Sequence, residues 1–258
     1  MNIVIGDIGN TVTKICIVDE KSFKIKKEFR FDSYKINSSL FFKKKIKSFK
    51  KYKPFFKTGL FSSVVPKHYS IIKKSLKKIL KINLLEIKNK KIDKIININI
   101  KNKNQVGSDR IANAAGVYKK YKNNCIVLDF GTATTFDVVT KTGNYNGGVI
   151  APGVNLSIKS LSISADQIPI FSLKKQGKII GKNTIEALRS GFYWGYSGLI
   201  NNIILKIEKE TKKKYKIIFT GGYATLFRTS IIRSFTIDKN ITIEGIIEIF
   251  KNNRNYLT

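Results

Sequence analysis

Asp7-Ile8-Gly9-Asn10-Thr11-Val12, near the start of the chain, recurs in altered form at its midpoint as Asp129-Phe130-Gly131-Thr132-Ala133-Thr134. Each copy follows a short apolar run rich in β-branched residues and leads into a second such run. This pattern predicts a strand, a tight Asp-x-Gly turn and another strand, which together form a β-hairpin. The repeat therefore predicts two hairpins of one design in the two halves of the chain.

The tip of each predicted hairpin carries groups that suit a phosphate. The glycine has no Cβ to block close approach to the backbone N–H groups, and Thr11, Thr132 and Thr134 add hydroxyl donors. The aspartate at the start of each turn can hold a hydrated divalent cation. Two such tips facing each other would bind a nucleoside triphosphate from both sides. The alternative for each copy is an ordinary turn, because Asp-Gly pairs are common in hairpins.

The composition is compatible with a large α/β protein. The chain has 258 residues, of which 42% are hydrophobic, enough to bury a sizeable core. No apolar run reaches the length of about 18 residues that a transmembrane helix needs, and no secretory signal is recognisable before the first predicted strand. Cys16 and Cys125 lie in apolar runs, so we expect two buried, reduced thiols and a cytoplasmic protein.

The formal net charge of +32 raises the question of a polyanionic partner. The lysines are spread along the chain together with many isoleucines and asparagines, and all three residue types have A/T-rich codons. The sequence shows no zinc finger, no recognition helix and no basic run interleaved with aromatic residues. We therefore attribute the charge to genomic base composition, and we expect no specific nucleic-acid partner and no membrane partner.

The order of the predicted elements suggests two lobes. In the first half we expect strands at Ile3–Asp7, Thr13–Asp19, Ile25–Arg30 and Thr58–Val65, with a basic, less regular stretch before the last of these, up to about Lys57. We also expect an amphipathic helix at Lys67–Lys81 and short β runs at Asn83–Ile87 and Ile95–Ile100. Besides the second hairpin, the second half holds predicted helices at Asp109–Tyr121, Val154–Ser162 and Asn183–Glu210. A predicted strand at Ile217–Phe219 leads into a Gly-Gly turn and a helix, and a closing helix is predicted at Ile246–Phe250. This repeated order predicts an α/β fold of two similar lobes with a cleft between them, residues 1–106 and 107–258.

Six segments resemble the actin, hexokinase and heat-shock-chaperone superfamily of ATPases and, in detail, the type III pantothenate kinases. In chain order they are residues 7–11, Gly107-Ser108-Asp109-Arg110-Ile111-Ala112-Asn113, residues 129–137, residues 147–153, Gly181-Lys182-Asn183-Thr184 and Thr220-Gly221-Gly222. The resemblance implies two actin/ribonuclease-H-like lobes with mixed sheets and an ATP cleft. It also implies ATP-dependent phosphorylation of pantothenate to 4'-phosphopantothenate, the first step of coenzyme A biosynthesis. The alternative is a noncatalytic nucleotide-binding regulatory relative of the same fold.

The same resemblance implies roles for single residues. Asp109 would accept the hydroxyl proton of pantothenate, Asp7 would hold Mg²⁺ through water, and Asp129 would bind a monovalent cation, K⁺ or NH₄⁺. The implied ATP-binding residues are Asp7, Ile8, Gly9, Asn10, Thr11, Val12, Thr13, Lys14 and Thr132. The implied substrate-binding residues are Gly107, Ser108, Asp109, Arg110 and Thr184. Retention of the three aspartates favours an enzyme, since a pure binding module needs no base.

Structural roles remain open for several of these residues. Asp109 suits the N-cap of a helix that begins near Arg110. For Arg110 the alternative is an ordinary surface arginine. Asn183 and Thr184 likewise suit the cap of the next long helix. One position departs from the family pattern: its members usually carry a tyrosine seven residues before the glycine of G-x-D-R, and Ile100 stands there in this chain. The resemblance therefore implies that one pantothenate contact differs here.

The long helix predicted at Asn183–Glu210 carries Gly191, Gly195 and Gly198 beside Trp194. Glycines at this spacing predict close packing of the helix against a neighbour rather than chemistry. The resemblance further implies that this helical region supports a homodimer, with the substrate pocket built at the dimer interface.

Overall fold

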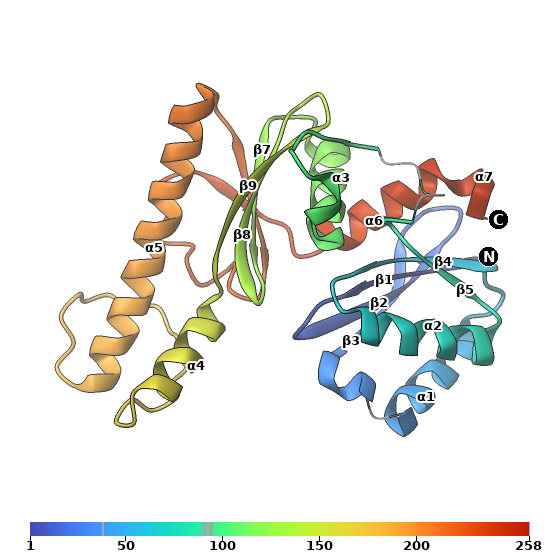
Figure 1. Cartoon of the computed structure of the whole chain (residues 1–258), viewed down its shortest axis with the longest axis horizontal. Helices are drawn as coiled ribbons and strands as arrows, with labels where there is room; N and C mark the ends of the chain where they lie inside the picture. Colours follow the sequence, from blue (N-terminus) through green and yellow to red (C-terminus); the bar gives the residue numbers. More distant parts are fainter. Residues whose placement is uncertain (38, 90–91, 93–94, 258) are drawn as a thin grey trace. The chain divides into compact units, whose positions relative to one another are not determined.

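The structure, a computed structural model, describes residues 1–37, 39–89, 92 and 95–257. The chain divides into two compact units (Figure 1). Unit 1 comprises Met1–Lys122, Thr142–Tyr145 and Asn240–Thr258, and unit 2 comprises Asn123–Lys141 and Asn146–Lys239. The predicted division had its boundary between residues 106 and 107. The observed one differs because α3 (Ser108–Tyr121) packs against the C-terminal α6 (Ile241–Asn252) within unit 1.

Unit 1 is built on a five-stranded mixed sheet with the strand order β3-β2-β1-β4-β5. The strands are β1 (Asn2–Ile8), β2 (Val12–Asp19), β3 (Ile25–Asp32), β4 (Thr58–Ser63) and β5 (Asn83–Glu86). The first three form an antiparallel meander, and β4 and β5 are added in parallel to β1. All five predicted strands are confirmed.

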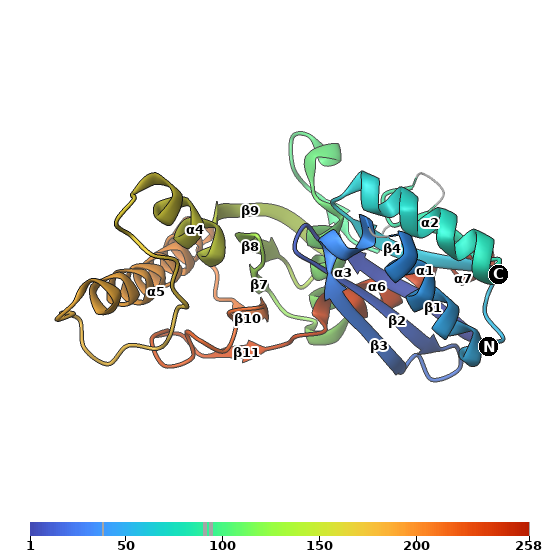
Figure 2. The same ribbon diagram turned by 90° about the horizontal axis from the view of Figure 1, so that it is seen from below.

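Helices cover both faces of the unit 1 sheet (Figures 1 and 2). On one face, α1 (Ser39–Lys47), α2 (Pro66–Leu80) and the 3₁₀ turns η1 (Ser33–Asn37) and η2 (Ser48–Tyr52) bury a core that includes Val4, Ile8 and Phe61. On the other face, α3 and α6 contact β1 and β4. The remaining elements of this unit are β6 (Asn97–Ile98), η3 (Lys103–Gln105) and α7 (Arg254–Leu257).

The basic stretch ending near Lys57 was expected to be less regular, and this expectation is wrong. It contains α1 and both 3₁₀ turns, since Phe42, Ile46 and Phe49 are fully buried against the sheet. Phe42 and Ile46 are four residues apart, so they share one face of α1. The predicted helix at Lys67–Lys81 is confirmed as α2, with Pro66 at its first position.

Unit 2 holds most of a six-stranded sheet with the order β11-β10-β7-β8-β9-β6; β6 and the first residues of β9 belong to unit 1. Its strands are β7 (Cys125–Phe130), β8 (Ala133–Val139), β9 (Asn144–Pro152), β10 (Lys216–Gly221) and β11 (Phe235–Ile237). The helices α4 (Val154–Ser164) and α5 (Thr184–Thr211) bury a core with this sheet that includes Leu128, Phe136 and Phe219. A helix was expected after Gly222, but residues 222–230 form turns.

The two sheets repeat one topology. The order β3-β2-β1-β4-β5 in unit 1 matches β9-β8-β7-β10-β11 in the second sheet, and β10 and β11 run parallel to β7 as β4 and β5 run parallel to β1. The predicted α/β class with mixed sheets is therefore confirmed. None of the helices described in the structure is long and apolar enough to cross a membrane. Cys16 and Cys125 are buried free thiols, and burial raises the pKa of each to about 12.

Candidate functional site at the hairpin turns

The first hairpin turns tightly at Gly9. The Gly9 backbone N–H donates to the Val12 carbonyl at 3.1 Å, and a Cβ at position 9 would lie within 2.9 Å of that oxygen. Ser33 braces the turn from the end of β3. Its Oγ donates to the Gly9 carbonyl at 2.6 Å and lies 2.8 Å from Thr13 Oγ1, and its backbone N–H donates to the Thr11 carbonyl at 2.8 Å. Buried groups thus fix the turn while Thr11 at its tip stays exposed.

Asp7 lies near the end of β1, next to two other strands. Antiparallel pairing places it opposite Lys14 of β2, and parallel pairing places it beside Ser62 of β4. Ser108, the first residue of α3, is bonded to the end of β4: its Oγ accepts from the Ser63 N–H at 2.8 Å and donates to the Ser63 carbonyl at 2.7 Å. The carboxyl ends of β1 and β4 and the start of α3 therefore meet at one edge of the unit 1 sheet.

Asp109 is the second residue of α3, directly at this edge. Gly107 is the N-cap, and a Cβ there would come within 2.4 Å of Asp109 Oδ1. The glycine therefore leaves room for the Asp109 carboxylate beside the start of the helix, where Oδ1 accepts from the Arg110 N–H at 2.8 Å. The alternative that Asp109 is the N-cap is wrong, because the helix begins at Ser108.

The surroundings of Asp109 favour its neutral form. Burial raises the pKa of this carboxyl above its ordinary value, and the N–H hydrogen bond and positive charge of Arg110, together with the charge of Lys88, offset only part of the effect. A carboxylate with a raised pKa is a stronger base. The environment of Asp109 therefore suits a group that takes up a proton.

Three residues near the start of α3 were missed by the sequence analysis. The Glu86 carboxyl, at the end of β5, is hydrogen-bonded to the Ser108 hydroxyl, and burial raises its pKa. Lys88 Nζ donates to the Asn104 carbonyl at 2.9 Å and so anchors the loop before Gly107. Tyr145, at the start of β9, lies under the Arg110 guanidinium. The parallel pairing of β4 with β5 could have indicated Glu86, whereas nothing local in the sequence points to Tyr145.

The second hairpin, in unit 2, turns at Gly131, whose N–H donates to the Ala133 carbonyl at 3.1 Å. Asp129 lies near the end of β7 and is paired with Thr220 of β10. The next residue of β10, Gly221, has φ +85°, and a Cβ there would lie 2.6 Å from Asp129 Oδ1. Only a glycine therefore fits this close approach of backbone to carboxylate.

Gly153 approaches the same turn from the end of β9. A Cβ at position 153 would come within 2.1 Å of the Thr132 carbonyl oxygen, so the glycine lets the two backbones touch. The Gly222 N–H donates to the Phe130 carbonyl at 3.0 Å and holds the β10 turn to the hairpin. Three of the segments singled out in the sequence thus converge around the second hairpin, and Thr132 remains exposed at its tip.

Thr184 is the exposed first residue of α5. The preceding Asn183 is the N-cap, and its Oδ1 accepts from the Glu186 N–H at 2.9 Å. Glu186 Oε2 in turn accepts from the Lys182 N–H at 2.8 Å, which completes a reciprocal cap. The capping interpretation is confirmed for Asn183, and it leaves the Thr184 side chain at the surface.

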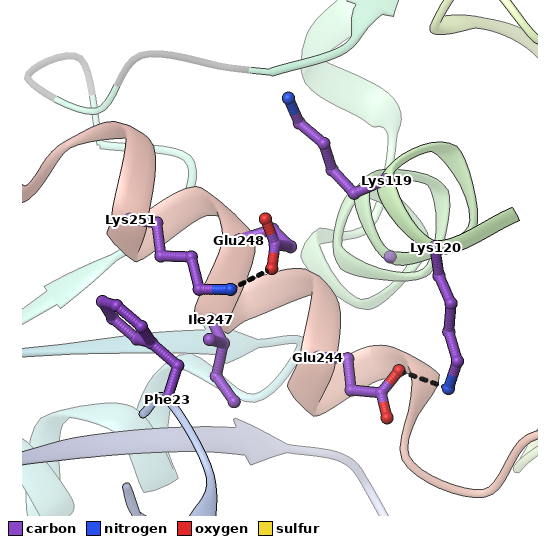
Figure 3. Close-up of a pocket in the computed structure, with 8 residues that line it drawn as sticks. Phe23, Lys119, Lys120, Glu244, Ile247, Glu248 and Lys251 are labelled. Carbon is purple, nitrogen blue, oxygen red and sulfur yellow. Dashed lines mark hydrogen bonds and ion pairs between the residues drawn. The ribbon is translucent and has the colours of Figure 1, made fainter. Parts of the chain in front are cut away.

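A cavity of about 400 Å³ lies elsewhere in unit 1, between α3, α6 and the β2–β3 turn (Figure 3). Its walls carry two ion pairs, Lys120–Glu244 at 2.7 Å and Lys251–Glu248 at 2.5 Å. The residues that line it include none of the predicted site residues. Within the described ranges, no three His, Cys, Asp or Glu side chains gather closely enough to hold a metal ion by themselves.

Comparison with known sequences gives one consistent family. A sequence model described as type III pantothenate kinase matches residues 3–206. A type III pantothenate kinase of Pelagibacter ubique (strain HTCC1062) is 50% identical over 245 residues, which cover 95% of this chain and 97% of that protein. Another, of Paramagnetospirillum magneticum (strain ATCC 700264 / AMB-1), is 37% identical over 195 residues, 76% of this chain and 75% of that protein.

Comparison with solved structures gives the fold. A Baf family protein from Campylobacter jejuni aligns with a TM-score of 0.62 and 20% identity over 98% of this chain and 100% of that chain. The activator of the 2-hydroxyisocaproyl-CoA dehydratase from Clostridium difficile, solved with bound ADPNP, aligns with a TM-score of 0.58 and 11% identity over 99% of this chain and 97% of that chain. At these identities the similarity shows a shared fold and nothing further.

Proposed function

The chain belongs to the type III pantothenate kinase family, whose reaction is the phosphorylation of pantothenate in coenzyme A biosynthesis, and we propose that Asp109 is the base of this reaction. ATP is the phosphoryl donor that a kinase of this family requires, together with a divalent metal. The observation that carries the proposal is the placement of Asp7 and Asp109 at one edge of the unit 1 sheet, where β1, β4 and α3 meet.

The proposed step is an in-line transfer. The primary hydroxyl of pantothenate attacks the γ-phosphorus of ATP, its proton passes to the Asp109 carboxylate, and ADP leaves with the electrons of the broken P–O bond. Asp109 suits this role because burial raises its pKa and because the rigid start of α3 fixes its position. The backbone N–H groups at a helix start also favour an anionic substrate.

ATP would be held by the first hairpin, residues 7–14, and by Thr132 of the second. Gly9 and the Ser33 brace support this role, since they leave a fixed turn whose exposed tip has room for phosphate oxygens. The Asp7 carboxylate would hold Mg²⁺ through water, and Mg²⁺ commonly uses one or two carboxylates with waters and substrate phosphates. When bound, the metal neutralises charge on the transferred group.

Asp129 would bind the monovalent cation, K⁺ or NH₄⁺. Its carboxylate is surrounded by backbone at Gly221 and Gly131, with Thr220 paired beside it. Carbonyl and carboxylate oxygens without strict geometry suit a large monovalent ion better than Mg²⁺. Such an ion would offset phosphate charge on the side of the second hairpin.

Pantothenate would contact Gly107, Ser108 and Arg110 at the start of α3, and Thr184 at the start of α5. Arg110 suits an anionic acceptor because its guanidinium is permanently charged and carries several N–H donors. Ile100, which stands where the family usually has a tyrosine, is partly buried in the loop after β6. This apolar side chain would offer the acceptor a contact without a hydroxyl.

A homodimer would form along α5. Gly191, Gly195 and Gly198 lie on its exposed side. Apart from the backbone of the helix itself, no atom of the described residues lies within 4 Å of a Cβ placed at any of the three. The residues that the structure describes therefore do not supply the predicted packing neighbour. A second copy would supply it, since a strip of glycines lets two helices approach closely. Gly195→Arg should then shift the particle mass from dimer to monomer in light scattering, with Lys209→Glu on the same helix as control.

The direct test of the proposed function is product formation. Purified protein with ATP, Mg²⁺, K⁺ and pantothenate should yield ADP and 4'-phosphopantothenate in equal amounts, measured by mass spectrometry. Omission of pantothenate should abolish ADP release. A folded protein that binds ATP but forms no phosphopantothenate would instead support the noncatalytic regulatory alternative.

A further inference from the structure

A short segment that includes the first residues of β9, Thr142–Tyr145, lies along α3. Thr142–Tyr145 belongs to unit 1, where the Asn97 N–H donates to the Gly143 carbonyl and the Asn99 N–H donates to the Tyr145 carbonyl, both at 2.9 Å. Gly143, with φ +81°, also packs on Tyr118 of α3, so that a Cβ would come within 3.0 Å of the ring. Strand β6 and helix α3 therefore fix this segment in place.

The segment carries one large aromatic side chain into the interior. Tyr145 is 1% exposed, and the Arg110 guanidinium carbon lies over its ring, 5.7 Å from the ring centroid. This distance is within the range of a cation–π contact. The ring attracts the cation through its face, so this contact uses none of the guanidinium N–H donors.

Arg110 has a second possible neighbour, the carboxylate of Asp109. The backbone N–H of Arg110 is bonded to Asp109 Oδ1, and the positive charge of the Arg110 side chain lowers the pKa of that carboxyl. A mobile guanidinium would spend part of its time on this carboxylate, where it would neither bind substrate nor leave the base unmasked. A fixed ring under the guanidinium limits that movement.

We propose that Tyr145 is a positioning residue for pantothenate: its ring holds the Arg110 guanidinium in the orientation that binds the acceptor. The proposal rests on the proposed role of Arg110 in substrate binding. It predicts that the aromatic ring, and not the hydroxyl of Tyr145, determines acceptor affinity.

The test compares Tyr145→Phe with Tyr145→Leu. Tyr145→Phe keeps the ring face, so the KM for pantothenate should stay within about twofold of wild type. Tyr145→Leu removes the ring and should raise that KM by about 2- to 30-fold, the range that a cation–π contact accounts for. The KM for ATP and kcat should change by less than about twofold in both variants. Equal KM values in Tyr145→Leu and wild type, or equal damage in Tyr145→Phe and Tyr145→Leu, would overturn the proposal.

Tyr118→Leu is the matched control, because it removes another ring that packs on the same segment but lies at the far end of α3. It should lower thermal stability without changing the KM for pantothenate. If Tyr145→Leu does not fold, phenylalanines with increasing fluorine content at position 145 keep the shape while weakening the ring face. The KM should then rise with each fluorine, and a constant KM would contradict the proposal.

Arg110→Lys separates the two levels of the argument. A raised pantothenate KM in Arg110→Lys with an unchanged one in Tyr145→Leu would overturn the role of Tyr145 alone. An unchanged KM in Arg110→Lys would overturn the substrate role of Arg110, and the inference with it. In the double variant, the effect of Tyr145→Leu should be smaller than in the wild-type background, because the two residues act through one contact.

Discussion

The two hairpins share a topology but differ in what surrounds their aspartates. In the first, Asp7 is paired across the parallel strands with Ser62, and the next residue, Ser63, is bonded to the start of α3. In the second, Asp129 is paired with Thr220 at the equivalent place, and the next residue is Gly221, whose backbone crowds the carboxylate. The residue after the paired one thus bonds to the start of a helix in the first copy, at Ser63, and precedes a turn in the second, at Gly221.

This difference separates two tasks within a duplicated framework. The serine-lined edge of unit 1 anchors the helix that carries Asp109, so the first hairpin lies beside the proposed base. At the glycine-lined edge of unit 2, the backbone of Gly221 crowds Asp129, and the helix that begins beside this hairpin, α4 with Gly153 as its N-cap, has no acidic residue in its first turn. We infer that the first hairpin belongs to the chemistry and that the second serves charge neutralisation.

The largest effect is expected from Asp109→Asn. Loss of the proton acceptor should lower kcat by about 10²-fold or more, while the KM for ATP stays within about twofold. Steady-state kinetics on a folded variant measure both values. Asp32→Asn is the control, because Asp32 is an exposed carboxylate that forms an ion pair with Lys35 at 3.2 Å, and it should leave both values unchanged.

Asp7→Asn is expected to have the next largest effect, and a different one. Removing a charged group that holds Mg²⁺ through water should lower kcat/KM for Mg–ATP by about 10-fold or more, in line with the usual worth of hydrogen bonds to charged groups. Raising the Mg²⁺ concentration should recover part of the loss. Unchanged use of Mg–ATP would remove Asp7 from the ATP site and would leave the first hairpin a structural turn.

Gly221→Ala tests the crowded backbone of the second hairpin. Its φ of +85° and the 2.6 Å approach to Asp129 Oδ1 should lower the free energy of unfolding by about 1–3 kcal/mol. Gly222→Ala is the matched control, since the nearest atom to a Cβ there, the Phe130 carbonyl oxygen, is 3.8 Å away. Denaturant unfolding of both variants gives the comparison, and equal stabilities would show that the close approach is not required.

The pH dependence should report Asp109. Burial disfavours its charged form, so this carboxyl holds its proton to a higher pH than an ordinary aspartic acid, whose pKa is about 4. Since the base acts only when ionised, kcat should fall as the pH is lowered through a value above 4. The residual activity of Asp109→Asn should lack this acidic limb. A limb that persists in Asp109→Asn would assign it to another group.

The smallest effect is expected at the thiols. Cys16 and Cys125 lie inside strands of the two sheets, and burial raises the pKa of each to about 12. A thiol reagent at neutral pH should therefore modify neither residue in the native protein and both after unfolding. Fast modification of one thiol under native conditions would show that its strand opens.

The sequence predicted what short-range chemistry determines. The two hairpins follow from their Asp-x-Gly turns between β-branched runs, and the tight turns at Gly9 and Gly131 are present. The segments 147–153 and Thr220-Gly221-Gly222 were singled out in the sequence, and Gly153 and Gly221 within them are sites where a side chain would clash. These features are local, because turn residues and close backbone approaches restrict the residue type at one position.

Features that depend on distant contacts were not predictable in the same way. Helix α1 was missed because three consecutive lysines separate Phe42 from Ile46, and only the packing against the sheet shows why these two residues stabilise a helix. The packing of α3 on α6 brings Ala112 next to Gly245, where a Cβ would lie 1.8 Å from the Ala112 carbonyl oxygen. The contact of Arg110 with Tyr145 is of the same kind, since neither residue type indicates its partner.

The central claim, a division of tasks between the hairpins, is tested most directly by potassium activation in Asp7→Asn and Asp129→Asn. Rates of phosphopantothenate formation are measured for both variants and the wild type in buffers that contain only K⁺ or only Na⁺. We predict that K⁺ activates the wild type and Asp7→Asn by about 10-fold over Na⁺, the scale of one charged contact, and that Asp129→Asn is equally slow in both buffers. Equal activation by K⁺ in Asp129→Asn and wild type, or its loss in Asp7→Asn, would contradict the account.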